Sequence, residues 1–169
     1  CGFGRTGNMW GSETFNIRPD IVTAAKALSS AYLPISAVII SEKVYGPIKD
    51  QANELGIFGH GYTYSAHPVC AAVAMKAQQI MIERNIIENV KQLSKLFNDR
   101  IKNIKNNSWF LSHSRSVGLI GAVEFGYEGN KKFEIKNKIA AKCAKIIQEN
   151  GVILRALPGD IIGFCPPPV

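Results

Sequence analysis

Lys26 is the residue of this chain whose type and setting most directly suggest covalent chemistry. It lies in an apolar run with Val22, Ala24, Ala25 and Leu28, although lysine is rarely buried without a partner. Burial disfavours the charged form of an amine, which makes the amine a better nucleophile toward a carbonyl or an aldehyde. The alternative is a lysine at the end of an apolar element, with a packed stem and a hydrated amine. The local sequence alone favours this simpler alternative.

A polar loop at residues 59–68, GHGYTYSAHP, is a second candidate site. Polar groups gathered in a loop between ordered elements are typical of binding sites. The spacing of His60 and His67 matches no common pattern of metal ligands, so we expect no metal site. The hydroxyl and backbone N–H groups of the loop suit a phosphate better.

A glycine-rich stretch at residues 1–16 contains Arg5 and Thr6 at its centre. Closely spaced glycines let the backbone turn and approach a ligand, and an arginine beside a hydroxyl suits an anion. A tight surface turn is the simpler interpretation.

The composition indicates a folded domain with a real core. The chain has 169 residues, of which 46% are hydrophobic. No apolar run approaches the length of a membrane span, and the first residues lack a signal pattern, so we expect a cytoplasmic protein without a membrane partner. Cys1, Cys70, Cys143 and Cys165 lie far apart, which predicts reduced thiols.

The positive charge is concentrated in the second half of the chain. Residues 85–169 hold thirteen basic and seven acidic residues, and residues 1–84 hold seven and six. A basic half could bind an anionic polymer, which leaves a non-catalytic binding module as an alternative class of function. The lysines lie mostly within amphipathic helical patterns, however, so a solvated helix face is the simpler explanation. We expect no nucleic-acid partner.

The elements that would position these residues follow from the apolar periods. Residues 20–28 are ambiguous, because their spacing fits a helix and their β-branched run fits a strand. Residues 35–41 are nearly all apolar, which predicts a strand in the interior of a sheet, covered on both faces. The remaining expected elements are a helix at 42–50, a loop at 51–61, a long helix from Pro68, a second helix from 86 that ends at 106–107, a strand at 117–125, a loop at 126–130, a third helix at 134–150, and strands at 152–154 and 161–164.

Five segments at matching spacing carry a family resemblance. They are residues 1–7 (CGFGRTG), 19–30 (PDIVTAAKALSS), 32–38 (YLPISAV), 61–68 (GYTYSAHP) and 159–167 (GDIIGFCPP). Together they resemble the class III pyridoxal-phosphate-dependent aminotransferases, the group of omega-amino-acid and amine:pyruvate transaminases. The resemblance implies an α/β protein of fold type I, with residues 1–84 ending the large cofactor-binding domain and residues 85–169 forming most of a small α+β domain.

The same resemblance implies roles for four residues. The segment before Lys26 becomes a strand, and Lys26 falls on the lysine that forms a Schiff base with pyridoxal 5'-phosphate. Thr63 falls on the threonine that binds the cofactor phosphate across the interface of a homodimer, with the Tyr62 backbone beside it. Arg155 matches a mobile arginine that receives a substrate carboxylate, although a surface arginine at a strand end is the alternative.

The implied activity is transfer of an amino group between an omega-amino acid or amine and pyruvate or a related keto acid. A racemase or an aminomutase with the same cofactor is a close alternative. The chain departs from the family pattern at Ala31 and Ala66, where relatives often have glycine. Its glycine-rich start and open end lead us to expect an internal piece of a longer chain, inactive alone, with an aspartate for the pyridine nitrogen just before residue 1.

Overall fold

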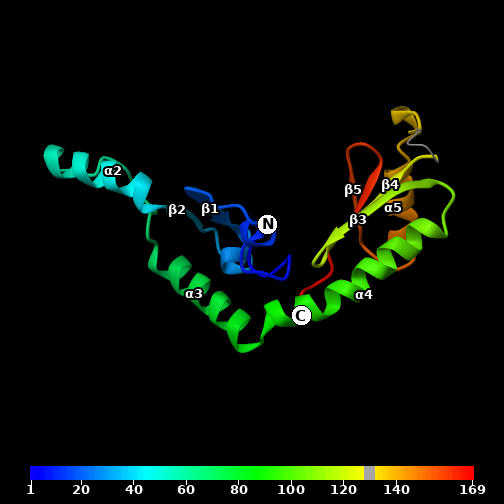
Figure 1. The fold of residues 1–169 in the computed structure, drawn as a ribbon, viewed down its shortest axis with the longest axis horizontal. Coiled ribbons are helices and arrows are strands. Elements are labelled where there is room, and N and C mark those ends of the chain that lie inside the picture. The colour runs from blue at the N-terminus through cyan, green and yellow to red at the C-terminus, as the bar shows by residue number, and fades with distance from the viewer. Residues whose placement is uncertain (128–131) are drawn as a thin grey trace. The chain divides into compact units, whose positions relative to one another are not determined.

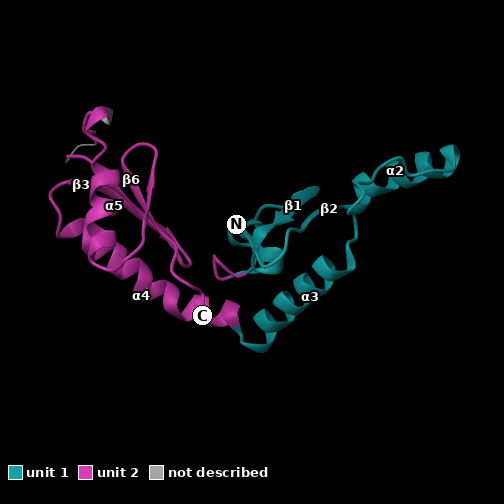
Figure 2. Ribbon diagram, turned by 180° about the vertical axis from the view of Figure 1, so that it is seen from behind, with its two compact units in different colours: residues 1–3, 8–85 teal, residues 4–7, 86–169 magenta. Residues whose placement is uncertain are grey.

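The computed structural model describes residues 1–127 and 132–169, which divide into two units. Unit 1 comprises residues 1–3 and 8–85, and unit 2 comprises residues 4–7 and 86–169 (Figure 2). Among the described residues, no helix combines the length and the apolar character that crossing a membrane requires. We describe the two units separately.

Unit 1 contains two paired strands and three α-helices (Figure 1). Its elements are α1 (Gly11–Thr14), β1 (Ile21–Ala25), the 3₁₀ helix η1 (Lys26–Ser29), β2 (Ser36–Ile40), α2 (Glu42–Leu55) and α3 (Pro68–Glu83). The ambiguous segment is therefore a strand that ends in a single 3₁₀ turn at Lys26. The long helix from Pro68 is confirmed, with the proline in its first turn, where a missing N–H costs no hydrogen bond.

The strand predicted at residues 35–41 is confirmed, but its predicted place inside a sheet is wrong. In the described part of the chain, β2 pairs with β1 alone, antiparallel, with Ala24 opposite Ala37. Val38 and Ile39 are 67% and 47% exposed. The apolar run predicts a strand covered on both faces, whereas no described element covers β2 on its exposed side.

Helix α2 is longer than the sequence predicted. The helix continues through residues 51–55 and ends at Gly56, whose φ of 71° gives a left-handed C-cap. Glycine adopts this conformation at little steric cost, which makes it a common residue at the end of a helix. Only the second part of the predicted loop at 51–61 therefore lies outside the helix.

Unit 2 is an α+β arrangement around a four-stranded antiparallel sheet. Its elements are α4 (Ile86–Asn106), β3 (Leu111–Val117), β4 (Ile120–Phe125), η2 (Ile135–Asn137), α5 (Ile139–Glu149), β5 (Arg155–Leu157) and β6 (Ile161–Phe164). The strand order is β3-β4-β6-β5. Helix α4 confirms the second predicted helix.

Three boundaries in unit 2 differ from the predictions. The expected strand at 117–125 is the end of β3, a turn and β4, and the rest of β3 was not predicted. The third helix begins at Ile139, because η2 takes up the preceding residues. The first of the two final strands is β5, three residues later than expected. Part of the predicted loop at 126–130 lies outside the described residues.

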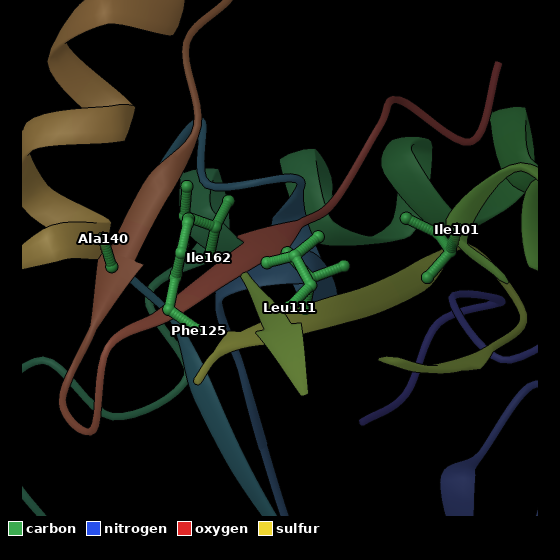
Figure 3. Packing of buried hydrophobic residues seen from close by; sticks show 6 residues of the cluster. Ile101, Leu111, Phe125, Ala140 and Ile162 are labelled. Carbon is green, nitrogen blue, oxygen red and sulfur yellow. The ribbon is translucent and has the colours of Figure 1, made fainter. Parts of the chain in front are cut away.

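The core of unit 2 lies between the sheet and its two long helices. Ile101 of α4, Ala140 of α5 and Leu111, Val123, Phe125 and Ile162 of the sheet form one buried cluster (Figure 3). Burial alternates along β4, as expected for a strand with one face toward a core. Both helices therefore cover the same face of the sheet.

Asp160 joins three elements of this unit. Its side-chain Oδ1 accepts a hydrogen bond from the backbone N–H of Ala140, 3.1 Å away in the first turn of α5. Its carbonyl oxygen accepts the N–H of Phe125 at 2.9 Å, at the end of β4. Asp160 itself lies directly before β6 with a left-handed φ of 54°. Burial, with the nearby Asp160 charge, raises the pKa of the Cys143 thiol in α5.

An ion pair between Arg115 and Glu124 links β3 to β4 on the sheet. The hydrogen bond from Arg115 lowers the pKa of the Glu124 carboxyl, against an opposing effect of burial. A depressed native pKa stabilises the fold above the ordinary glutamate range, and this contribution is lost as the pH falls through the native pKa. We expect Glu124→Gln to lower the free energy of unfolding near neutral pH by about 0.5–1 kcal/mol.

The measurement is urea unfolding of both proteins from neutral to acidic pH. The difference between them should shrink as Glu124 becomes protonated. A constant difference across this range would contradict the assignment, because it would reflect packing alone.

Candidate functional site

Lys26 lies directly after β1, at the first position of η1, with a left-handed φ of 54°. For a residue other than glycine this conformation costs about 1–2 kcal/mol. Such strain persists only where the surrounding structure enforces it, and it is concentrated at functional sites. Lys26 is exposed, as the simpler interpretation of its local sequence predicts, and the alternative of a buried amine does not hold for this chain. Its local environment is that of a hydrated lysine at a strand end.

A backbone hydrogen bond, a serine hydroxyl and a side chain of α3 hold the turn that follows Lys26. The Lys26 carbonyl accepts the N–H of Ala31 at 2.9 Å. Ser29 is 1% exposed, and its hydroxyl donates to the Leu33 carbonyl at 2.7 Å. Helix α3 packs on η1, and Gln78 donates to the backbone of η1 from there. Gln78 could not be predicted as a site residue, because nothing in its local sequence distinguishes it from a solvent-facing helix residue.

Thr63 lies in a tight turn that leads into α3. The N–H of Ser65 donates to the Tyr62 carbonyl at 2.9 Å, and the Tyr62 N–H donates to the Ser65 hydroxyl oxygen at 2.9 Å. These two bonds close the turn and leave Thr63 exposed within it. The Tyr62 N–H is thus already used inside the turn, where the resemblance implied a contact with phosphate.

The imidazoles of the polar loop contact aromatic rings. His60 lies between Phe58 and Tyr62, with ring centroids 5.8 and 5.5 Å away. His67 precedes α3 and lies 6.0 Å from the Tyr64 ring. No group of three or more metal-ligating side chains occurs in residues 1–127 and 132–169.

Arg155 and Arg5 both belong to unit 2, whereas Lys26 and Thr63 belong to unit 1. Arg155 is the exposed first residue of β5, opposite Gly163 of β6. Arg5 donates to the carbonyl oxygen of Pro166. The simpler interpretation of the glycine-rich stretch therefore holds for Arg5, because its guanidinium anchors the backbone instead of facing an open anion site.

The two alanines at positions where the family resemblance implies glycine both adopt left-handed conformations. Ala31 has a φ of 61° and Ala66 a φ of 56°. Ala31 follows the Lys26 turn and Ala66 follows the Thr63 turn, so each strained position adjoins a candidate site residue. Glycine suits such positions because it lacks the Cβ that makes them costly.

We expect Ala31→Gly to raise the free energy of unfolding by about 0.5–1 kcal/mol, because relief of the left-handed penalty exceeds the extra chain entropy of glycine. Urea unfolding measures the change. Ala27→Gly is the matched control within η1, where φ is not positive, and it should destabilise the protein. Equal losses in both variants would contradict the explanation.

Comparison with known proteins places the chain in a family. The family model for aminotransferase class-III matches residues 1–169. Gamma aminobutyrate transaminase 1, mitochondrial, of Solanum lycopersicum is 44% identical over 169 residues, which are 99% of this chain and 32% of that protein. The chain spans about a third of the length of the curated relatives that it matches.

Solved transaminase structures share the fold. One from work on directed evolution by ancestral reconstruction is 39% identical with a TM-score of 0.96, over 100% of this chain and 38% of that one. The omega transaminase of Pseudomonas jessenii, in complex with PMP, is 38% identical with a TM-score of 0.85, over 100% of this chain and 37% of that one. The chain belongs to the class III aminotransferases, and the predicted fold class is confirmed.

Proposed function

We propose that Lys26 binds pyridoxal 5'-phosphate covalently. The observation that carries the proposal is the left-handed backbone of Lys26, held at the end of β1 by η1 and α3. Lysine amines bind carbonyl carbons covalently. Membership in the class III family and the PMP complex of a related structure support pyridoxal phosphate as the group that provides the aldehyde.

The described residues supply a donor set that fits this cofactor. Lys26 offers an exposed amine for the aldehyde, and Thr63 offers an exposed hydroxyl for the phosphate. When bound, the cofactor supplies an electron sink for charge that develops on the substrate. Lys26 would hold the cofactor of its own subunit and carry a proton, and Thr63 would donate a hydrogen bond to a phosphate oxygen of the cofactor in the other subunit. Tyr62 shapes the turn through its two backbone hydrogen bonds.

We further propose that the complete protein is a transaminase. It moves an amino group between an omega-amino acid or amine and pyruvate or a related keto acid, and Arg155 receives a substrate carboxylate. The names of related proteins, gamma aminobutyrate transaminase and omega transaminase, support this substrate class.

The proposal includes a cytoplasmic homodimer in which Thr63 completes the site of the partner subunit. Large apolar side chains on the exposed surface of unit 1 support association, among them Tyr62 and Tyr64 beside Thr63, at 78% and 80% exposure. Sedimentation of the purified protein measures its mass in solution, and cell fractionation tests its location.

The central experiment is chemical trapping. The protein is expressed from its complete reading frame, mixed with pyridoxal phosphate and reduced with borohydride, and the modified peptide is then mapped. We expect the label on Lys26. A principal label at another lysine, or no label on Lys26 above the slow background of exposed lysines, would overturn the assignment. Assays with pyruvate and with 2-oxoglutarate, using omega-amino acids and simple amines as donors, then define the substrates.

A further inference from the structure

Gln78 donates side-chain hydrogen bonds from α3 to the backbone next to Lys26. Its Nε2 lies 2.8 Å from the carbonyl oxygen of Leu28 and 3.2 Å from that of Ala27. The two acceptors are consecutive residues of η1, fifty and fifty-one positions earlier in the chain. We infer that Gln78 is a positioning residue for Lys26, an inference that rests on the proposed role of Lys26.

The orientation of the Gln78 amide follows from its neighbours. Both acceptors are carbonyl oxygens, so only the NH₂ group of the amide can face them. The Oε1 atom is then buried without a hydrogen-bond partner in the described structure. A buried polar atom without a partner is destabilising, and an apolar side chain of the same length would avoid it. The role of the Gln78 amide at this position is therefore the hydrogen bonding of its NH₂ group to the carbonyl oxygens of η1.

The turn at Lys26 needs such support from outside. A 3₁₀ helix is used in short pieces and has poorer hydrogen-bond geometry than an α-helix. η1 has four residues, and both Lys26 at its start and Ser30 at its end have left-handed φ values, 54° and 52°. Strained residues of this kind persist only where surrounding contacts enforce them.

The consequence for chemistry lies in the direction of the Lys26 side chain. The φ of Lys26 fixes the direction of its Cα–Cβ bond. The rotatable bonds of the side chain then determine how far the amine can move around that direction. When η1 is held by α3, the amine explores a smaller region around one direction. Positioning a reacting group in this way accelerates a reaction without changing the group itself. Gln78 thus acts on the rate at which Lys26 captures an aldehyde.

Gln79 provides a matched control in the next position of the same helix. Its Nε2 donates to Glu83 Oε1 at 2.6 Å, within α3, and its side chain is exposed. Gln78→Met and Gln79→Met remove the same amide from neighbouring positions and keep similar length and helix propensity. Only Gln78→Met removes a hydrogen-bond donor to η1.

The first measurement needs no cofactor. Hydrogen exchange is followed at the Ala31 and Ser30 amides, which donate to the Lys26 and Ala27 carbonyls at 2.9 and 3.1 Å. In protein from the complete reading frame, Gln78→Met should speed exchange at these amides about tenfold, as expected for the loss of a supporting hydrogen bond. Gln79→Met should leave them unchanged.

The second measurement is the rate of capture. Pyridoxal phosphate is mixed with each protein, and the absorbance change and the borohydride-trapped label on Lys26 are followed over time. Gln78→Met should slow attachment about tenfold, while the final labelled fraction at saturating cofactor stays the same. A purely structural role would instead lower the labelled fraction in proportion to unfolded protein, without changing the rate for the folded remainder.

Gln78→Glu adds a pH test and covers the case in which the methionine variant folds poorly. An ionised carboxylate has no donor and faces two carbonyl oxygens, whereas the protonated acid can donate one hydrogen bond. The attachment rate of this variant, relative to wild type at each pH, should therefore recover as the pH falls through the range of the carboxyl group. Gln79→Glu should show no such dependence.

The outcomes separate this inference from the proposed function. If wild-type protein carries no label on Lys26, the proposed function fails, and the exchange data still test the contact with η1. If wild type is labelled and the Gln78 variants match the Gln79 variants in both exchange and rate, the inference is overturned. Slower attachment with unchanged exchange would also overturn it, because Gln78 would then act by another route.

Discussion

Lys26→Ala is expected to abolish covalent attachment of pyridoxal phosphate while leaving the fold intact. Alanine has no amine, and no other group in the turn from Lys26 to Ser29 can replace it. Because Lys26 is exposed, its loss should change the free energy of unfolding by no more than about 0.5 kcal/mol. A lost label therefore reports chemistry. The measurements are borohydride trapping with peptide mapping, and urea unfolding of the same preparation.

Lys43→Ala is the control for nonspecific modification. Lys43 is also exposed and lies in unit 1, with an ion pair to Asp20 at 3.2 Å. Exposed lysines react slowly with any aldehyde, so a background label on this variant and on wild type is expected. Retention of the full label in Lys26→Ala would show that another lysine captures the cofactor.

Gly118→Ala is expected to destabilise unit 2 by about 3 kcal/mol. Gly118 has a φ of +55° in the turn between β3 and β4. A Cβ there would lie 2.4 Å from the Arg5 carbonyl oxygen and 2.5 Å from the Thr6 Cα. Both are backbone atoms, and the same Arg5 oxygen accepts the N–H of Leu119 at 3.0 Å. The methyl group can be accommodated only if this hydrogen bond moves.

Gly151→Ala separates this steric cost from the cost of a positive φ. Gly151 lies in the same unit with a φ of +88°, and a Cβ there would meet nothing within 4 Å. Its replacement should cost about 1–2 kcal/mol, from backbone strain alone. Urea unfolding of both variants gives the difference. Equal losses would mean that the contact with residues 5 and 6 adds nothing.

The elements that the sequence predicted best are those with a strong apolar period or a clear end signal. Helix α3 begins at Pro68 as expected, and β6 and α4 lie where their apolar residues placed them. Most of β3 could not be predicted because the strand is largely polar. Its half-buried alternate positions hold serines, where an apolar residue would have signalled a strand. β5 was misplaced because pairing with β6, with Arg155 opposite Gly163, decides its position more than its own composition does.

The candidate site was predictable only in part, for a similar reason. The position of Lys26 at a strand end followed from a family resemblance, since the local pattern fits a helix as well as a strand. The exposure of Lys26 could not be inferred from its apolar neighbours, because Lys26 lies beyond the end of β1, at the start of η1 with a left-handed φ of 54°, where the alternation of strand faces no longer applies. The contact of Gln78 with η1 joins residues fifty positions apart and depends on tertiary packing.

The bonds of Asp160 bear on how unit 2 unfolds. One residue supplies a cap to the start of α5 and an acceptor to the end of β4, and it lies at the entrance to β6. If Asp160 moves, both the start of α5 and the end of β4 lose a hydrogen bond. We therefore expect local opening at this point to cost more free energy than fraying of a simple helix or strand end. We also expect opening at Asp160 to loosen the start of α5 and the end of β4 together.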